Sequence, residues 1–171
     1  MAAFLFSIIA AEIYPAHSNA GTYLGCTSAR SPQQMRTEYP AKVLLAWGEA
    51  ISGHAGLRDW LIKNGYPELG IFTFALRNKD DARLWLMKNG HPHLLAVITG
   101  IEGDKSALVW LQRNNMNVLG KVAMAGDGDE AAFQWLVDQG HRELAIVSRK
   151  IFFVKREIDE DNRDPHKYSQ D

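Results

Sequence analysis

Histidine and acidic residues are the side chains of this sequence whose spacing could do chemistry. His91 and His93 flank Pro92 in one turn, and two imidazoles so close together can reach one metal ion. No cysteine, aspartate or glutamate completes a familiar ligand spacing around them, so we expect neither a metal site nor a cofactor. The run Asp-Gly-Asp-Glu at 127–130 offers oxygen ligands for calcium but lacks the alternating ligands and distal glutamate of a calcium loop. Capping of a helix N-terminus explains this run better.

Motifs for nucleophilic or phosphate chemistry are missing from the sequence. No Gly-rich loop follows a strand pattern, and no serine stands in a nucleophile-elbow motif. The carboxylates of Glu49, Glu102 and Asp127 could converge on one face, but without a perturbing partner they are better explained as solvated groups. Cys26 is the only cysteine, which excludes an internal disulfide and favours a reducing compartment. We therefore expect a protein without enzymatic activity.

A fixed period is the strongest pattern in the chain, and it must position all of these side chains. Four Trp-Leu pairs recur every 25 residues, and a period in this range is typical of stacked supersecondary units. The pairs begin at Trp60, Trp85, Trp110 and Trp135. The units are 41–65, 66–90, 91–115 and 116–140, followed by a half unit at 141–154. Position one of each unit is thus residue 41, 66, 91, 116 or 141.

Each unit predicts two short helices. The first begins near position two and carries an apolar stripe, which in the third unit is Leu94, Val97, Ile98 and Ile101. The second helix carries Ala-x-x-Trp-Leu and ends before a glycine or asparagine at position 25, the residue type that follows a helix C-terminus. We expect the tryptophans to be buried in the core, and regard an exposed aromatic ladder for sugars or bases as the less favoured alternative.

The second helices, in particular 81–90 and 129–140, resemble the second helix of ankyrin repeats, and the segment 92–96 resembles the opening of the first helix. The resemblance covers residues 41–150. It implies an all-α, right-handed solenoid of helical hairpins that acts as a scaffold for protein–protein interaction. The ankyrin period is about 33 residues, so eight residues are missing here, and the projecting β-hairpin finger is expected to be absent.

Two rows of side chains are candidates for contacting a protein or peptide partner. Position nine lies off the leucine stripe and changes chemistry in every unit, and in ankyrin-like stacks the first helices line the concave face. Unconstrained surface is an equally good explanation of this variation. The second row is the loop between units, where large side chains either pack over the neighbouring unit or contact a peptide or small molecule. The two rows are Glu49, Phe74, Thr99, Met124 and Arg149, and Tyr66, His91 and His93.

Charge gives no support for nucleic-acid binding. The whole chain has a net charge of −1, and residues 41–150 contain 13 Lys or Arg against 12 Asp or Glu, a difference of +1. A helical-solenoid enzyme or nucleic-acid binder, of the kind seen in HEAT-like DNA glycosylases, is therefore the alternative function. Small-molecule binding at the loop row is a further one.

The two ends lie outside the repeats. Residues 1–40 are expected to form a segment that caps the first unit, which agrees with a cytoplasmic protein. The alternative is a signal-like segment, with the apolar run 2–11 and a cleavage site at 18–20, which would make the protein secreted or periplasmic. The charged tail 155–171 is expected to be disordered, and no stretch has the length and apolarity of a membrane span.

Overall fold

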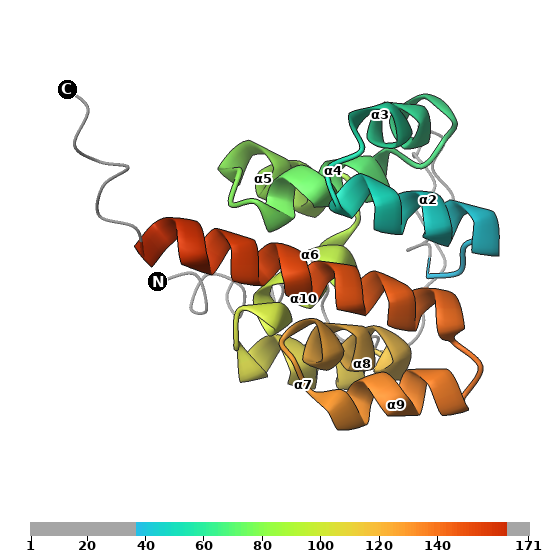
Figure 1. Cartoon of the computed structure of the whole chain (residues 1–171), viewed down its shortest axis with the longest axis vertical. Helices are drawn as coiled ribbons and strands as arrows, with labels where there is room; N and C mark the ends of the chain where they lie inside the picture. Colours follow the sequence, from blue (N-terminus) through green and yellow to red (C-terminus); the bar gives the residue numbers. More distant parts are fainter. Residues whose placement is uncertain (1–36, 164–171) are drawn as a thin grey trace, which may run out of the picture.

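The computed structural model describes residues 37–163, which form nine α-helices and no β-strand (Figure 1). The prediction of an all-α fold is thus confirmed for this part of the chain. The predictions for residues 1–36, a capping or signal-like segment, and for residues 164–171 lie outside the described residues. The helices are α2 Ala41–Ile51, α3 Ala55–Lys63, α4 Pro67–Leu76, α5 Asp80–Lys88, α6 Pro92–Ile101, α7 Lys105–Arg113, α8 Asn117–Gly126, α9 Glu130–Asp138 and α10 Arg142–Arg163.

Each 25-residue unit forms one helical hairpin, and the turns fall at the same positions in every unit. Position 13, between the two helices, and position 25, between units, both have positive φ angles. Glycine occupies most of these places, because it adopts a positive φ without strain. Asn78 and Asn115 fill the other two, each with φ 59°, and asparagine is the residue that best tolerates this conformation after glycine. The backbone conformation thus follows the sequence period.

Polar side chains close the ends of the outer helices. Asn64 donates from Nδ2 to the carbonyl oxygen of Trp60 at 2.7 Å, and asparagines in the next two units repeat this bond at 2.8 Å. At the other end, the carboxylates of Asp104 and Asp129 accept hydrogen bonds from the main-chain N–H groups of Ser106 and Ala132. The bond of Asp129 confirms the N-cap interpretation of the run 127–130, and Asp104 caps the outer helix of the third unit in a similar way.

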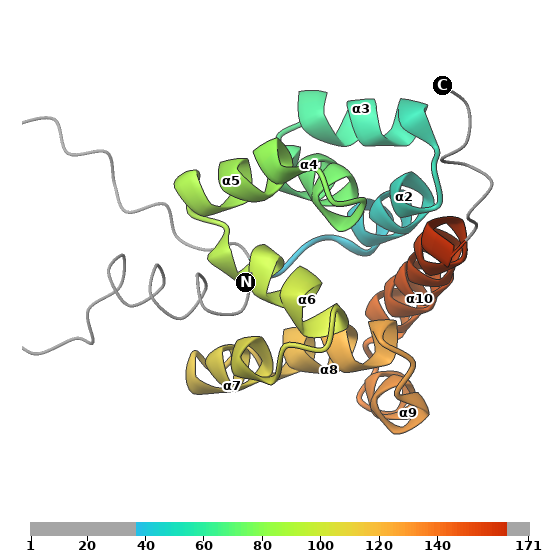
Figure 2. The same ribbon diagram turned by 90° about the vertical axis from the view of Figure 1, so that its left-hand side faces the viewer.

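The first helices of the units form an inner layer and the second helices an outer layer. The inner helices α2, α4, α6, α8 and α10 contact one another in this order, and α10 packs back against α2 (Figure 2). Each outer helix lies over the junction between two inner helices: α3 over α2 and α4, α5 over α4 and α6, α7 over α6 and α8, α9 over α8 and α10. The row of hairpins therefore closes into a ring, which the repeat pattern alone does not predict.

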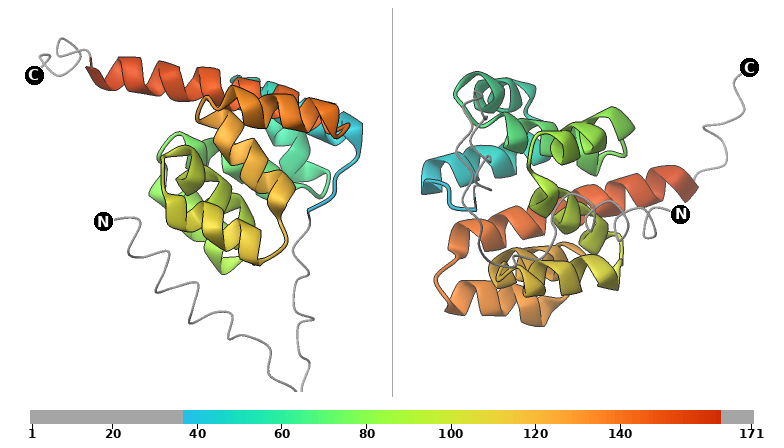
Figure 3. Two further views of the ribbon diagram at one scale, coloured as in Figure 1. Left: turned by 90° about the horizontal axis from the view of Figure 1, so that it is seen from below. Right: turned by 180° about the vertical axis from the view of Figure 1, so that it is seen from behind.

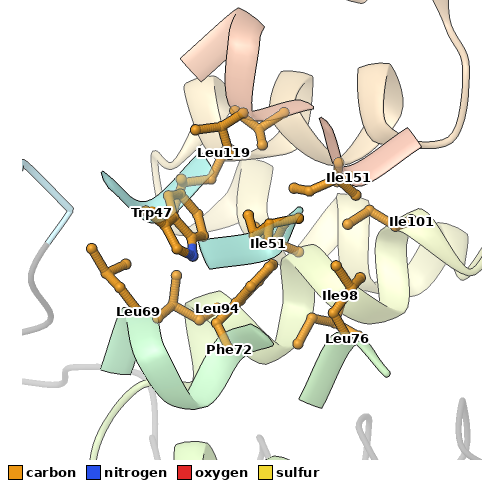
Figure 4. Close-up of a cluster of buried hydrophobic side chains, with 14 of the residues drawn as sticks. Trp47, Ile51, Leu69, Phe72, Leu76, Leu94, Ile98, Ile101, Leu119 and Ile151 are labelled. Atoms are coloured by element: carbon orange, nitrogen blue, oxygen red, sulfur yellow. The ribbon is translucent and has the colours of Figure 1, made fainter. Parts of the chain in front are cut away.

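The interior of the ring is an apolar core (Figure 4). Side chains from all five inner helices meet there, among them Trp47, Phe72, Ile98, Leu119 and Ile151. The rings of Trp47 and Phe72, from neighbouring units, meet edge to face with centroids 4.9 Å apart. These side chains fill the space between the inner helices at the centre of the ring.

The tryptophans of the Trp-Leu pairs are not in this core, so that prediction is wrong. Trp60 is 43% exposed, and the other three are half-buried. The leucine that follows each of them is 0% exposed in all four units. A nine-residue outer helix buries only a narrow stripe, which the leucine and, in units two to four, the alanine three residues before the tryptophan occupy. The adjacent tryptophan therefore lies at the edge of the interface.

α10 is longer than the other inner helices and forms polar contacts that hold the ring closed. Residues 155–163, predicted to be disordered, continue α10 to Arg163 and extend past the hairpins (Figure 3). Lys150 forms an ion pair with Glu49 of α2 at 3.0 Å, and Lys155 donates to the carbonyl oxygen of Ile101 at 2.6 Å and pairs with Asp127. These cations lie at the carboxyl ends of α2, α6 and α8, where the helix dipoles favour positive charge.

Candidate functional site

Two of the position-nine side chains contact the outer helix of the preceding unit. Phe74 of α4 packs under the guanidinium of Arg58 on α3, with the carbon of that group 4.4 Å from the ring centroid. Arg149 of α10 packs over Phe133 of α9 at 4.1 Å and also pairs with Glu130 at 2.9 Å. The two contacts join the same repeat positions, nine and 18, with the arginine and phenylalanine exchanged.

The remaining members of this row also have partners within the chain. Thr99 is buried and donates its hydroxyl to main-chain oxygens of α6, at 3.2 Å from Leu95 and 3.3 Å from Ala96. Met124 is half-buried against the core, and Glu49 pairs with Lys150. Part of the chemical variation along position nine therefore follows from contacts inside the molecule, since Glu49, Phe74 and Arg149 each interact with a side chain of another helix.

The loop-row residues are packed against aromatic neighbours. Tyr66 contacts Tyr39 with ring centroids 6.2 Å apart, and His91 stacks on Trp85 at 5.9 Å. His93 is 0% exposed and meets the ring of His91 edge to face at 5.9 Å. Among residues 37–163, no three histidine, cysteine, aspartate or glutamate side chains are grouped so that they could hold a metal ion.

A cavity of about 540 Å³ opens at the loop edge, where the amino ends of α2, α8 and α10 come together. Apolar side chains from the three helices form much of its wall, and polar groups of the loops complete it. None of the predicted loop-row residues Tyr66, His91 and His93 lines it, although Met116 and His141 hold the same repeat position as Tyr66 and His91. The lining residues are Thr37, Glu38, Tyr39, Leu44, Asn115, Met116, Val118, Leu119, His141 and Leu144.

A second candidate site is the junction between α10 and α2, which sequence reasoning missed. No outer helix of the described chain lies over the junction between these two inner helices (Figure 1). Leu45 of α2 is 45% exposed, and Ile146 and Phe153 of α10 are 45% and 58% exposed. Together with Glu49 and Lys150, which pair across the junction, these side chains make up what we call the α2–α10 surface.

One signal in the sequence points to this junction. Position ten is Ala50, Ala75, Gly100 and Ala125 in the four complete units, and small residues there let the following outer helix approach. The half unit has Lys150 instead, and its Cδ lies 3.0 Å from the place that a Cβ on Gly48 would take. The lysine thus distinguishes the half unit from the four complete units, in each of which an outer helix follows the small residue.

Comparisons with protein-family models, with curated proteins and with solved structures find no significant match. No helix among residues 37–163 has the length and apolar character needed to cross a membrane.

Proposed function

We propose that this chain is a non-enzymatic protein–protein interaction module built from ankyrin-like helical hairpins, and that it binds its partner on the α2–α10 surface. The observation that carries the proposal is the exposure of Leu45, Ile146 and Phe153 at the one junction of the described ring without an outer helix. Single exposed apolar residues are common on protein surfaces, whereas a group of them along two neighbouring helices is typical of a binding site.

The chemistry of this surface agrees with a protein partner. Large apolar side chains supply most of the binding energy in protein interfaces, and charged groups around them set orientation. Here the apolar side chains flank the Glu49–Lys150 ion pair, of which Glu49 belongs to the position-nine row. Glu49 is the position-nine residue that we assign to partner contact, because it lies on this surface.

Affinity capture from the native host, with the full chain as bait, tests this function. The bait variants are Phe153→Asp together with Ile146→Asp, and Val109→Asp is the matched control, since Val109 is exposed to 43% on α7 away from the surface. We expect a reproducible protein partner that is lost with the double variant and kept with the control. Salt-sensitive capture of DNA or RNA instead of a protein would favour the nucleic-acid alternative.

Small-molecule binding is a second candidate function, and the cavity at the loop edge favours it. Its volume of about 540 Å³ is within the range of small-molecule pockets, and its wall combines aliphatic side chains with the imidazole of His141 and the amide of Asn115. Ligand-observed nuclear magnetic resonance with a fragment library tests this function. We expect bound fragments to be displaced when Val118→Trp fills the cavity, and unchanged binding in this variant would contradict the assignment.

A further inference from the structure

We propose that the α2–α10 surface binds one short amphipathic helix of the partner protein, with acidic residues at its carboxyl end, in the place that an outer helix takes at the other four junctions. This inference rests on the proposed function and adds the kind of partner segment that the surface fits.

The other junctions of the ring indicate which kind of element fits the α2–α10 surface. At four junctions between inner helices, an outer helix of nine residues contacts both neighbours. The fifth junction, between α10 and α2, also joins two inner helices, but no outer helix of the described residues lies over it. In Figure 1, α10 and α2 lie side by side at the front of the molecule with no helix over them. A helix is therefore the shape that this surface matches.

The exposed residues lie on the faces that an outer helix covers elsewhere. Leu45 holds position five, where Gly70, Leu95 and Ala145 are buried. For Gly70 the covering element is the preceding outer helix, because an added Cβ would lie 2.5 Å from Ile62 of α3. α2 has no preceding outer helix among the described residues, so Leu45 is exposed.

The corresponding face of α10 is exposed for the same reason. Ile146 holds position six, where Ala96 is 0% exposed. Gly100, one turn along that face of α6, meets Leu108 of the following outer helix, with an added Cβ 3.0 Å from its Cδ2. Phe153 lies seven residues after Ile146, on the same side of α10. Leu45, Ile146 and Phe153 thus face the place of a missing helix from both sides.

Charge at the surface sets the chemistry of the partner helix. Lys42 lies one turn before Leu45, and Arg142 one turn before Ile146, and both are exposed. No ion pair joins either cation to another residue of the described chain, whereas Lys150 already pairs with Glu49. Outer helices run antiparallel to the inner helices, because short turns join them. A helix bound in this place would therefore bring its carboxyl end, and acidic residues near it, to Lys42 and Arg142.

The chain contains a suitable probe peptide in its own outer helix α9. Residues 129–140 combine an apolar stripe, including Phe133 and Leu136, with Asp138 in the last turn of the helix. We would measure binding of this peptide, acetylated and amidated, to the full-length protein by isothermal titration calorimetry. A second peptide with Asp138→Lys tests the charge assignment.

We expect saturable binding of the probe peptide with a Kd below about 1 mM. Leu45→Asp and Phe153→Asp should each weaken it at least about tenfold, while Val109→Asp should leave it unchanged. The Asp138→Lys peptide should bind several-fold more weakly. All variants carry a substitution at an exposed residue, and circular dichroism verifies that they remain folded. No binding up to about 1 mM, equal binding in all variants, or equal affinity of the two peptides would each overturn the inference.

Photo-crosslinking identifies the occupant directly. With p-benzoylphenylalanine in place of Phe153, mass spectrometry of the full chain mixed with the peptide should find the peptide attached at residue 153. Attachment to a second copy, or to residues 1–36 of the same chain, would show that the surface belongs to another occupant and would overturn the inference. If a host protein is captured equally well by the full chain and by the Leu45→Asp and Phe153→Asp variants, the inference is contradicted, while a protein-interaction function at another surface remains supported.

Discussion

Lys155 on α10 donates a hydrogen bond to the main-chain oxygen of Ile101, 2.6 Å away and 54 residues earlier in the chain. The same ammonium group pairs with Asp127 at the end of α8. One side chain from the last helix thus joins the carboxyl ends of two earlier inner helices. The last helix thereby supports the position of units that precede it by one and two repeats.

The first prediction concerns this contact. Lys155→Met keeps most of the apolar stem but removes the charge-assisted bonds, so we expect the free energy of unfolding to fall by about 1–3 kcal/mol. Urea denaturation followed by circular dichroism measures it. Lys105→Met, at an exposed residue in the first turn of α7, serves as the control and should change stability by less than about 0.5 kcal/mol. Equal effects of the two substitutions would contradict a role of the Lys155 contacts in stabilising the closed ring.

The second prediction compares two glycines at the same repeat position. A Cβ on Gly70 would lie 2.5 Å from Ile62 and 3.1 Å from the oxygen of Arg58, whereas a Cβ on Gly120 meets nothing within 4 Å. Gly70→Ala should therefore destabilise the protein by about 1–3 kcal/mol. Gly120→Ala should stabilise it by about 0.5–1 kcal/mol, since alanine is the better helix former. Thermal unfolding of both variants tests whether the sign differs between them.

The third prediction separates the two residues of a Trp-Leu pair. Leu111 is 0% exposed and Trp110 is half-buried. Leu111→Ala should lower the free energy of unfolding by about 2–5 kcal/mol through loss of apolar contacts and cavity formation. Trp110→Ala should cost less, although the side chain is larger, because part of it is already in water. A lower denaturation midpoint for Trp110→Ala than for Leu111→Ala would contradict this prediction and indicate that Trp110 belongs to the core.

The fourth prediction concerns the contact between Arg58 and Phe74. A double-mutant cycle with Arg58→Met and Phe74→Leu should give a coupling energy of about 0.5–1 kcal/mol, as expected for a partly exposed cation over an aromatic ring. A coupling within error of zero would mean that the two side chains contribute independently. In that case, position nine would have no demonstrated role between the units.

Much of the local structure could be predicted from the sequence. Proline at position two, as in Pro67 and Pro92, and glycine or asparagine at position 25 mark helix ends through backbone geometry, which depends on residues close in the chain. The apolar stripe of α6 is buried throughout, as its spacing indicates. Burial of the tryptophans could not be settled in this way, because two adjacent apolar residues at the edge of a stripe compete for one place in the interface.

The candidate site could not be predicted, because it depends on contacts between the two ends of the array. Lys150 donates to Ser52, a residue 98 positions earlier, at 3.2 Å. No periodicity in the sequence specifies how strongly consecutive hairpins curve, and the curvature decides whether α10 reaches α2. Leu45 and Ile146 are exposed because no outer helix of the described residues lies over the α2–α10 junction, and the apolar pattern of their own helices does not indicate this.

The closure of the ring has a consequence for how this chain can change length. An open array can gain or lose a 25-residue unit by duplication or deletion, because each hairpin contacts only its neighbours. Here an added hairpin would separate α10 from α2, and a deleted one would force them into each other, with loss of the Lys150 and Lys155 contacts in either case. We therefore expect this ring to tolerate substitutions within a unit but not the gain or loss of a whole unit, as in a closed propeller.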